Sequence, residues 1–219
     1  FSFGDNVNAT GSFSFCTGGG NATASGQSSI AMGYAAIASN TNAVAIGRNT
    51  DATHSGSAAI GYGAQAVASQ AIALGDSRAA GADSLAAAIA TNSTSYGATG
   101  ANSVALGYRA KATGQNGVAI GGTTNTASGS FSFAAGPSSN VASGLFSVAI
   151  GDACEATTNN AFALGHDGKS VTQGKFSYGS GKFSTVSDAQ TGTFVLRSDT
   201  TDATAEALTT NNGTAGTTN

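Results

Sequence analysis

The sequence predicts an all-β protein built as a parallel β-roll, a solenoid of 14-residue coils with two strands in each coil. The prediction starts from a four-residue word: an apolar residue, Ala or Ser, an apolar residue and Gly. This word recurs at a constant interval, since the glycines that close its first four clear copies stand at positions 33, 47, 61 and 75. Such a short repeat has no room for two helices and a turn, but it suits two short strands joined by tight turns.

The glycine that closes each word marks a predicted turn, because glycine adopts positive φ angles without a Cβ clash. The clear copies of the word place these repeat-turn glycines at Gly33, Gly47, Gly61, Gly75, Gly107, Gly121, Gly151, Gly165 and Gly179. Degenerate copies fill the gaps at Phe1–Gly4, Phe13–Cys16, Leu85–Ala88 and Phe131–Ala134. With this assignment the interval is longer from 16 to 33, from 134 to 151 and from 88 to 107, which predicts longer turns there.

Each repeat has a second half in which small apolar residues alternate with mostly polar ones, as in Ala110–Gly114. Successive side chains of a strand point to opposite faces. The first half is therefore apolar on both faces, with large residues on one and Ala on the other, whereas the second half has a single apolar face. The large positions of the first half form the predicted repeat core: Val44, Ile46, Ile72, Leu74, Val104, Leu106, Val118, Ile120, Val148, Ile150, Phe162 and Leu164.

A coil of two strands has one interior, so one apolar face of the first half remains outside it. Repeated over a dozen coils, that face forms an apolar stripe longer than monomeric proteins leave in water. We therefore predict that it is buried against identical chains around a symmetry axis. Burial of each large aliphatic side chain contributes about 1.5–3 kcal/mol. The pattern leaves open whether the Ala face or the Val/Ile face points to the axis.

The composition argues against several classes of function. Charged residues make up 9% of the chain, the net charge is −3, and no run of Lys or Arg is present for nucleic-acid binding. No stretch approaches the roughly 18 apolar residues of a membrane-spanning helix. Cys16 and Cys154 are expected about 40 Å apart along the roll, too far for a disulfide. We predict no nucleic-acid partner, no membrane span in this segment and no cofactor.

Candidate catalytic and metal-binding residues are few. His54 and His166 are the only histidines, and neither has a second ligand at metal-binding spacing. Residues 165–170 resemble part of a phosphate-binding loop, but Ala163 stands where that motif requires its first glycine, so we interpret them as a turn between coils. We predict no catalytic or metal-binding residue. We interpret the acidic residues Asp188, Asp199, Asp202 and Glu206 as solvated charges in loops.

The words Ser103–Gly107, Asn116–Gly121 and Ser147–Gly151 resemble the head repeats of trimeric autotransporter adhesins of the YadA type. The resemblance covers about residues 1–180. It implies a left-handed parallel β-roll that assembles as a homotrimer, so two identical chains are expected partners. It also implies an extracellular location and a host cell-surface glycan or protein as a further partner, with no receptor-binding residue that can be singled out.

The repeat stops after about Gly179, so a second region is predicted at 181–219. Residues 188–204 resemble a segment of bacteriophage tail-fibre proteins, and Phe194–Leu196 is predicted to be a strand. Neither a heptad stalk nor a membrane anchor is visible. This combination favours a bacteriophage tail fibre or virion appendage for host attachment. The alternative is a bacterial trimeric autotransporter adhesin head on the outer cell surface.

Two other functions compete with attachment. An ice-binding solenoid requires a regular array of Thr, but the outward positions of the second strand include Gln65, Lys111, Thr126 and Val141. A glycan-cleaving enzyme requires a carboxylate pair, for which Asp199 and Asp202 would be the residues to test. Since neither pattern fits, the sequence predicts a structural and adhesive protein that is not an enzyme.

Overall fold

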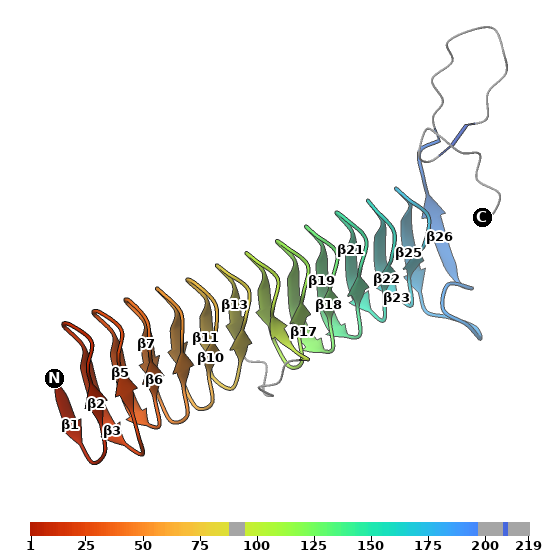
Figure 1. Cartoon of the computed structure of the whole chain (residues 1–219). Helices are drawn as coiled ribbons and strands as arrows, with labels where there is room; N and C mark the ends of the chain where they lie inside the picture. The colour runs from red at the N-terminus through yellow and green to blue at the C-terminus, as the bar shows by residue number, and fades with distance from the viewer. Residues whose placement is uncertain (88–94, 197–207, 210–219) are drawn as a thin grey trace, which may run out of the picture.

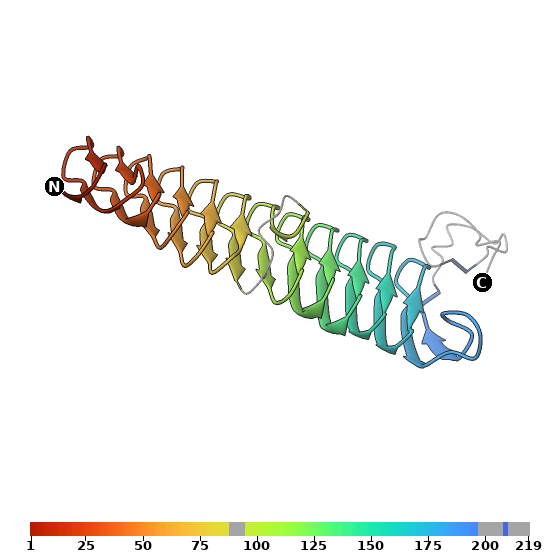
Figure 2. The same cartoon turned by 90° about the horizontal axis from the view of Figure 1, so that it is seen from below.

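The computed structural model describes residues 1–87, 95–196 and 208–209, and most of them form one elongated β-roll (Figure 1). Within these residues the chain alternates between a 14-stranded sheet, here sheet A, and a 12-stranded sheet, here sheet B. Seen from below, successive coils follow one another along a single axis (Figure 2). The predicted all-β parallel solenoid with two strands per coil is confirmed.

The strands are short, and their bounds follow the repeat. Sheet A contains β1 (Ser2–Gly4), β3 (Phe15–Gly19), β5 (Ile30–Tyr34), β7 (Val44–Ile46), β9 (Ala58–Ile60), β11 (Ile72–Leu74), β13 (Leu85–Ala87), β15 (Val104–Leu106), β17 (Val118–Thr123), β19 (Phe133–Ser138), β21 (Val148–Asp152), β23 (Phe162–His166), β25 (Phe176–Ser180) and β26 (Gln190–Thr193). Sheet B contains β2 (Asn8–Ala9), β4 (Thr23–Ala24), β6 (Ile37–Ala38), β8 (Asp51–Ala52), β10 (Gln65–Ala66), β12 (Arg78–Ala79), β14 (Gly97–Ala98), β16 (Lys111–Ala112), β18 (Thr126–Ala127), β20 (Val141–Ala142), β22 (Glu155–Ala156) and β24 (Lys169–Ser170).

The strand register corrects two of the degenerate copies. Gly4 pairs with Gly18, so the word in that coil is Phe15–Gly18 and not Phe13–Cys16. Gly121 pairs with Gly136, so the later word begins at Phe133 and not at Phe131. The long intervals predicted to end at Gly33 and Gly151 are therefore wrong, since each interval begins two positions later than expected and is nearly regular.

The displaced residues Phe13 and Phe131 stand in left-handed turn positions, with φ of 59° and 54°. Short apolar words differ little when shifted by two residues, so only the pairing between coils resolves their register. The long interval before Gly107 is confirmed, because Leu85 pairs with Val104. Ala88, the last residue of the degenerate word at 85–88, lies outside the described residues.

Alanine fills the interior of the roll. The middle residue of each sheet A word faces inward, as do Ala45, Ala59 and Ala105, each fully buried. The second residue of each sheet B strand meets it from the other side, as do Ala52 and Ala112. Two sheets joined by such short coils lie close together, so the space between them accepts a methyl group and little more.

Eight of the nine predicted repeat-turn glycines have positive φ, between 68° and 134°. Gly179 is the exception, because the chain does not start another coil there. It is buried in β25 and pairs with Gln190 of β26, and the positive-φ turn moves to Gly181, whose φ is 124°.

The end of the roll is covered by an antiparallel strand. β26 pairs with β25 in the opposite direction, whereas all the other described strand pairs are parallel. The sequence predicts a strand at Phe194–Leu196, but β26 ends at Thr193 and these three residues lie beyond it. The loop before β26 is closed by Asp188, whose carboxylate accepts hydrogen bonds from the backbone N–H groups of Phe183, Ser184 and Thr185 at 2.7–2.9 Å.

Candidate functional site

The outer face of sheet A carries two rows of large apolar side chains that run the length of the roll. They occupy the first and third positions of each word, on either side of the buried alanine, so they point away from the interior. We call this surface the apolar face. Its larger members are Ile30, Met32, Val44, Ile46, Ile60, Ile72, Leu74, Leu85, Val104, Leu106, Val118, Ile120, Phe133, Val148, Ile150, Phe162, Leu164, Phe176 and Tyr178.

All twelve predicted repeat-core residues belong to the apolar face and none lies inside the coil. Ile72 and Phe162 are 41% and 42% exposed, whereas the adjacent Ala73 and Ala163 are fully buried. The twelve residues do not form the interior of one chain, because large side chains do not fit between the two closely spaced sheets. The structure therefore decides which face of the first strand is internal: the Ala face points inward and the Val/Ile face points outward. The twelve outward residues are Val44, Ile46, Ile72, Leu74, Val104, Leu106, Val118, Ile120, Val148, Ile150, Phe162 and Leu164.

The outer face of sheet B is polar and mixed. Lys169 Nζ lies 2.8 Å from Glu155 Oε2, and Arg78 donates to Gln65 Oε1 at 2.7 Å. Burial raises the pKa of Asp51, and the positive charge of Arg78 partly opposes this shift. Since the same row also contains Thr126 and Val141, it lacks the regular Thr array of an ice-binding surface.

One edge of the roll, where sheet A turns into sheet B, carries stacked aromatic and cationic side chains. The Cζ of Arg48 lies 5.6 Å from the ring centroid of Tyr34 and 5.9 Å from that of Tyr62. Four coils further on, the Cζ of Arg109 lies 5.0 Å from the ring centroid of Tyr108 and 5.7 Å from that of Tyr96. We call these two groups the tyrosine–arginine edge.

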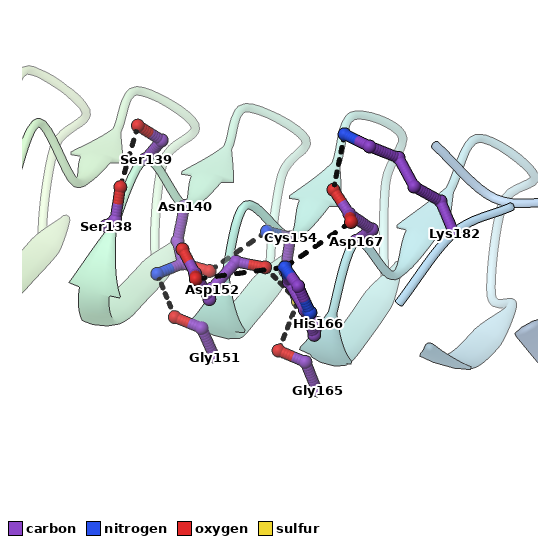
Figure 3. A network of polar contacts seen from close by, with 10 residues as sticks. All are labelled: Ser138, Ser139, Asn140, Gly151, Asp152, Cys154, Gly165, His166, Asp167 and Lys182. Atoms are coloured by element: carbon purple, nitrogen blue, oxygen red, sulfur yellow. Dashed lines mark hydrogen bonds and ion pairs between the residues drawn. The ribbon is translucent and has the colours of Figure 1, made fainter. Parts of the chain in front are cut away.

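A polar network lies near the C-terminal end of the roll (Figure 3). His166 Nε2 stands 3.4 Å from Asp167 Oδ2 and 3.8 Å from Asp152 Oδ2. Lys182 Nζ lies 3.4 Å from Asp167 Oδ1, and the Asp167 side chain is only 3% exposed. The network ties Lys182, which follows the last coil, to the turn between β23 and β24. The prediction that 165–170 form a turn between coils is only partly right, because Gly165 and His166 end β23 and Lys169 and Ser170 form β24. Only Asp167 and Gly168 form the turn, and it joins the two strands of one coil.

The one thiol in this network is not an activated nucleophile. Burial raises the pKa of Cys154, so it remains protonated near neutral pH. Its Sγ donates to the carbonyl of Gly165 at 3.2 Å. Cys16 and Cys154 are both buried and free.

The other residues considered for chemistry are spread over the roll. His54 Nδ1 contacts Thr53 Oγ1 at 3.1 Å, and Asp188 is engaged by backbone N–H groups. Asp199, Asp202 and Glu206 lie outside the described residues. In residues 1–87, 95–196 and 208–209, no three His, Cys, Asp or Glu side chains are grouped so that they could bind a metal. No helix in these ranges is long and apolar enough to cross a membrane.

Comparison with known families identifies the repeat. The model described as YadA head domain repeat (2 copies) matches residues 19–50, 52–77, 98–122 and 140–167, just over half of the chain. The chain belongs to the YadA head repeat family. No curated protein matches this YadA-type head closely enough to add a second comparison. The family match ends at residue 167, and the resemblance of 188–204 to bacteriophage tail fibres receives no support.

Two structural positions of the YadA repeat were missed from the sequence. Several apolar words follow a buried Ser whose hydroxyl donates to the carbonyl three residues earlier, at 2.7 Å from Ser103 to Gly100 and from Ser147 to Gly144. The residue two positions before the word adopts a left-handed conformation, and it is Asn in several coils, with φ of 55° at Asn102 and Asn116. The signals available in the sequence were the recurring Ser and, in other coils, the recurring Asn at these positions, because Asn tolerates positive φ and Ser hydroxyls bond to nearby backbone.

Proposed function

We propose that three copies of this chain assemble with their apolar faces around a common axis, and that the trimer is an adhesive fibre segment outside the cell. The observation that carries the proposal is the continuous apolar face of sheet A. Two rows of Val, Ile, Leu and Phe side chains remain 39–42% exposed or half-buried on one chain, far more than a monomer keeps in water. A threefold assembly buries the same face on every copy.

The family supports a bacterial trimeric autotransporter adhesin more strongly than a bacteriophage tail fibre. YadA-type head repeats account for residues 19–167 with gaps, whereas the resemblance to tail-fibre proteins covers only 188–204. We therefore place the bacterial outer surface first, which reverses the order that the sequence favoured. Attachment to a host cell-surface glycan or protein is part of the proposal.

A repetitive roll favours attachment over catalysis. Its exposed positions recur once per coil and on three chains, so weak contacts are multiplied along the fibre. Two of the described carboxylates are held by other groups, Glu155 by Lys169 and Asp188 by backbone amides. These features suit a rigid, non-catalytic head.

Sedimentation equilibrium of the full 219-residue chain tests the assembly. We expect three times the 21.0 kDa monomer mass. Ile120→Asp places a charge on the apolar face and should dissociate the trimer, whereas Thr126→Asp, on the outer face of sheet B, should leave it intact. A folded, soluble monomer for the unsubstituted chain overturns the proposal.

Adhesion is tested separately. Beads coated with the trimer should bind cultured cells, and beads coated with the dissociated Ile120→Asp chain should not. Equal binding by both preparations would show that attachment does not depend on the assembled fibre.

A further inference from the structure

The tyrosine–arginine edge concentrates rare residues in one place. The chain has five tyrosines and four arginines, and four of those tyrosines stack with two of the arginines here. Tyr34 and Tyr62 are 56% and 62% exposed, and Arg48 is exposed between them. These three side chains line up because their positions in the repeat are the same: Tyr34, Arg48 and Tyr62 directly follow the turn glycines of three successive coils.

Two ring contacts restrict the positions open to each guanidinium. Tyrosine rings lie on both sides of Arg48, within cation–π distance of its Cζ, and the arginine side chain stays exposed at the edge. The ring of Tyr34 is itself seated against Gly20, where an added Cβ would stand 2.4 Å from the ring. A pre-oriented guanidinium binds carboxylate or sulfate groups with two parallel hydrogen bonds at a low entropic cost.

The part of the chain that the structure describes gives neither arginine an acidic partner. Among the described residues, no carboxylate lies within ion-pair distance of Arg48 or Arg109, although Lys169 and Lys182 both form ion pairs. The Nε of Arg109 is buried without a hydrogen-bond acceptor. Asp76, which follows Gly75 in the coil after Tyr62, is the acidic residue that continues the row. The edge therefore presents two uncompensated cations framed by aromatic rings.

We infer that the tyrosine–arginine edge binds an acidic polysaccharide, with Arg48 and Arg109 contacting its carboxylate or sulfate groups and the exposed Tyr34, Tyr62 and Tyr108 contacting its sugar rings. This inference rests on the proposed adhesive function and names its ligand class. The two arginines lie about 19 Å apart along the roll, four coil steps of about 4.8 Å. One extended polymer spans both groups, so two weak contacts act together.

The test uses the trimeric full chain with three probes: dextran sulfate, hyaluronate and neutral dextran. We expect binding to at least one anionic probe, weakening steeply as salt is raised, and no binding to neutral dextran. Dextran sulfate alone would identify sulfate as the recognised group, and hyaluronate alone would identify carboxylate. Equal binding of neutral dextran, or no binding of either anionic probe, overturns the inference.

Variants locate the site. Arg48→Gln with Arg109→Gln should weaken binding at least tenfold, whereas Arg78→Gln, the matched loss of charge on sheet B, should change it less than twofold. Asp76→Asn should strengthen binding. Arg48→Lys keeps the positive charge but loses the paired N–H groups of the guanidinium, so it should weaken polysaccharide binding by an intermediate amount. This variant replaces the double variant if the double variant does not fold. An equal effect of Arg78→Gln, or dissociation of the trimer by Arg48→Gln, overturns the inference.

The inference and the proposed function fail in different ways. If cell adhesion persists while the arginine variants leave polysaccharide binding unchanged, the site assignment falls and the adhesive fibre stands. If the unsubstituted chain is a monomer, the proposed function falls whatever it binds.

Discussion

Gly47 and Gly61 lie so close across neighbouring coils that a Cβ built on Gly47 would stand 2.2 Å from the carbonyl oxygen of Gly61. The φ of Gly47 is also 131°, a backbone region that residues with a Cβ do not occupy without strain. The same contact recurs from Gly33 to Gly47. Glycine is therefore required at these positions for two reasons: the turn needs a positive φ angle, and the stacking of coils leaves no room for a Cβ.

Gly47→Ala should destabilise the chain by at least about 3 kcal/mol, because backbone strain and a backbone clash combine at one position. The matched control is Gly75→Ala. Gly75 has a φ of 68° and no atom within 4 Å of the added Cβ, so its cost should be about 1 kcal/mol. Urea unfolding followed by circular dichroism measures both, and equal losses would contradict the stacking requirement.

Ala134 and Ala135 are neighbours on opposite faces of β19, and leucine should have opposite effects at the two positions. Ala134 is fully buried between the sheets, so Ala134→Leu should overpack the interior and cost about 1–3 kcal/mol or more. Ala135 lies on the apolar face between Ile120 and Ile150, so Ala135→Leu should be tolerated. Thermal unfolding of the two variants gives the comparison, and a larger loss for Ala135→Leu would argue against an alanine-only interior.

Asn140 stabilises a widened turn through buried hydrogen bonds. Its side chain donates to the carbonyl of Gly151 at 2.5 Å and accepts from the backbone N–H of Cys154 at 3.1 Å. Asn140→Ala leaves both groups unsatisfied and should cost about 2–6 kcal/mol, at about 1–3 kcal/mol for each. Ser139→Ala, at the exposed neighbour, should cost less than about 0.5 kcal/mol. A neutral Asn140→Ala in chemical unfolding would show that water replaces these bonds.

Asp188 should keep the loop before β26 closed well into the acid range. Backbone hydrogen bonds from Thr185, Ser184 and Phe183 lower the pKa of Asp188 to about 2. Because its folded pKa is depressed below the ordinary 3.8, the contribution is complete above about pH 4 and is lost as the pH falls through about 2. NMR titration of the carboxyl carbon should give that midpoint, together with a shift of the Ser184 and Thr185 amide protons. In Asp188→Asn these amide shifts should no longer titrate, and a midpoint near 4 in the unsubstituted chain would contradict the closed loop.

The repeat made much of the fold predictable. Val44–Gly47 and Val104–Gly107 each predict a strand followed by a turn. Both predictions depend on a few neighbouring residues, because side chains alternate between the two faces of a strand and glycine adopts positive φ angles. The apolar excess of the first strand is equally visible in the sequence, and it predicts the unpartnered face. The degenerate words near Phe13 and Phe131 were misassigned because several registers satisfy the same short pattern.

The sequence by itself determined the parallel roll, its regular period and the existence of one surplus apolar face, because these depend on residues close together in the chain. Only the tertiary structure decided that Ala lines the interior and Val and Ile lie outside, because the spacing between the sheets is a property of the closed coils. It also brought Arg48 between Tyr34 and Tyr62. Side chains one repeat apart meet only when coils stack in register, and that register depends on pairing along the whole roll.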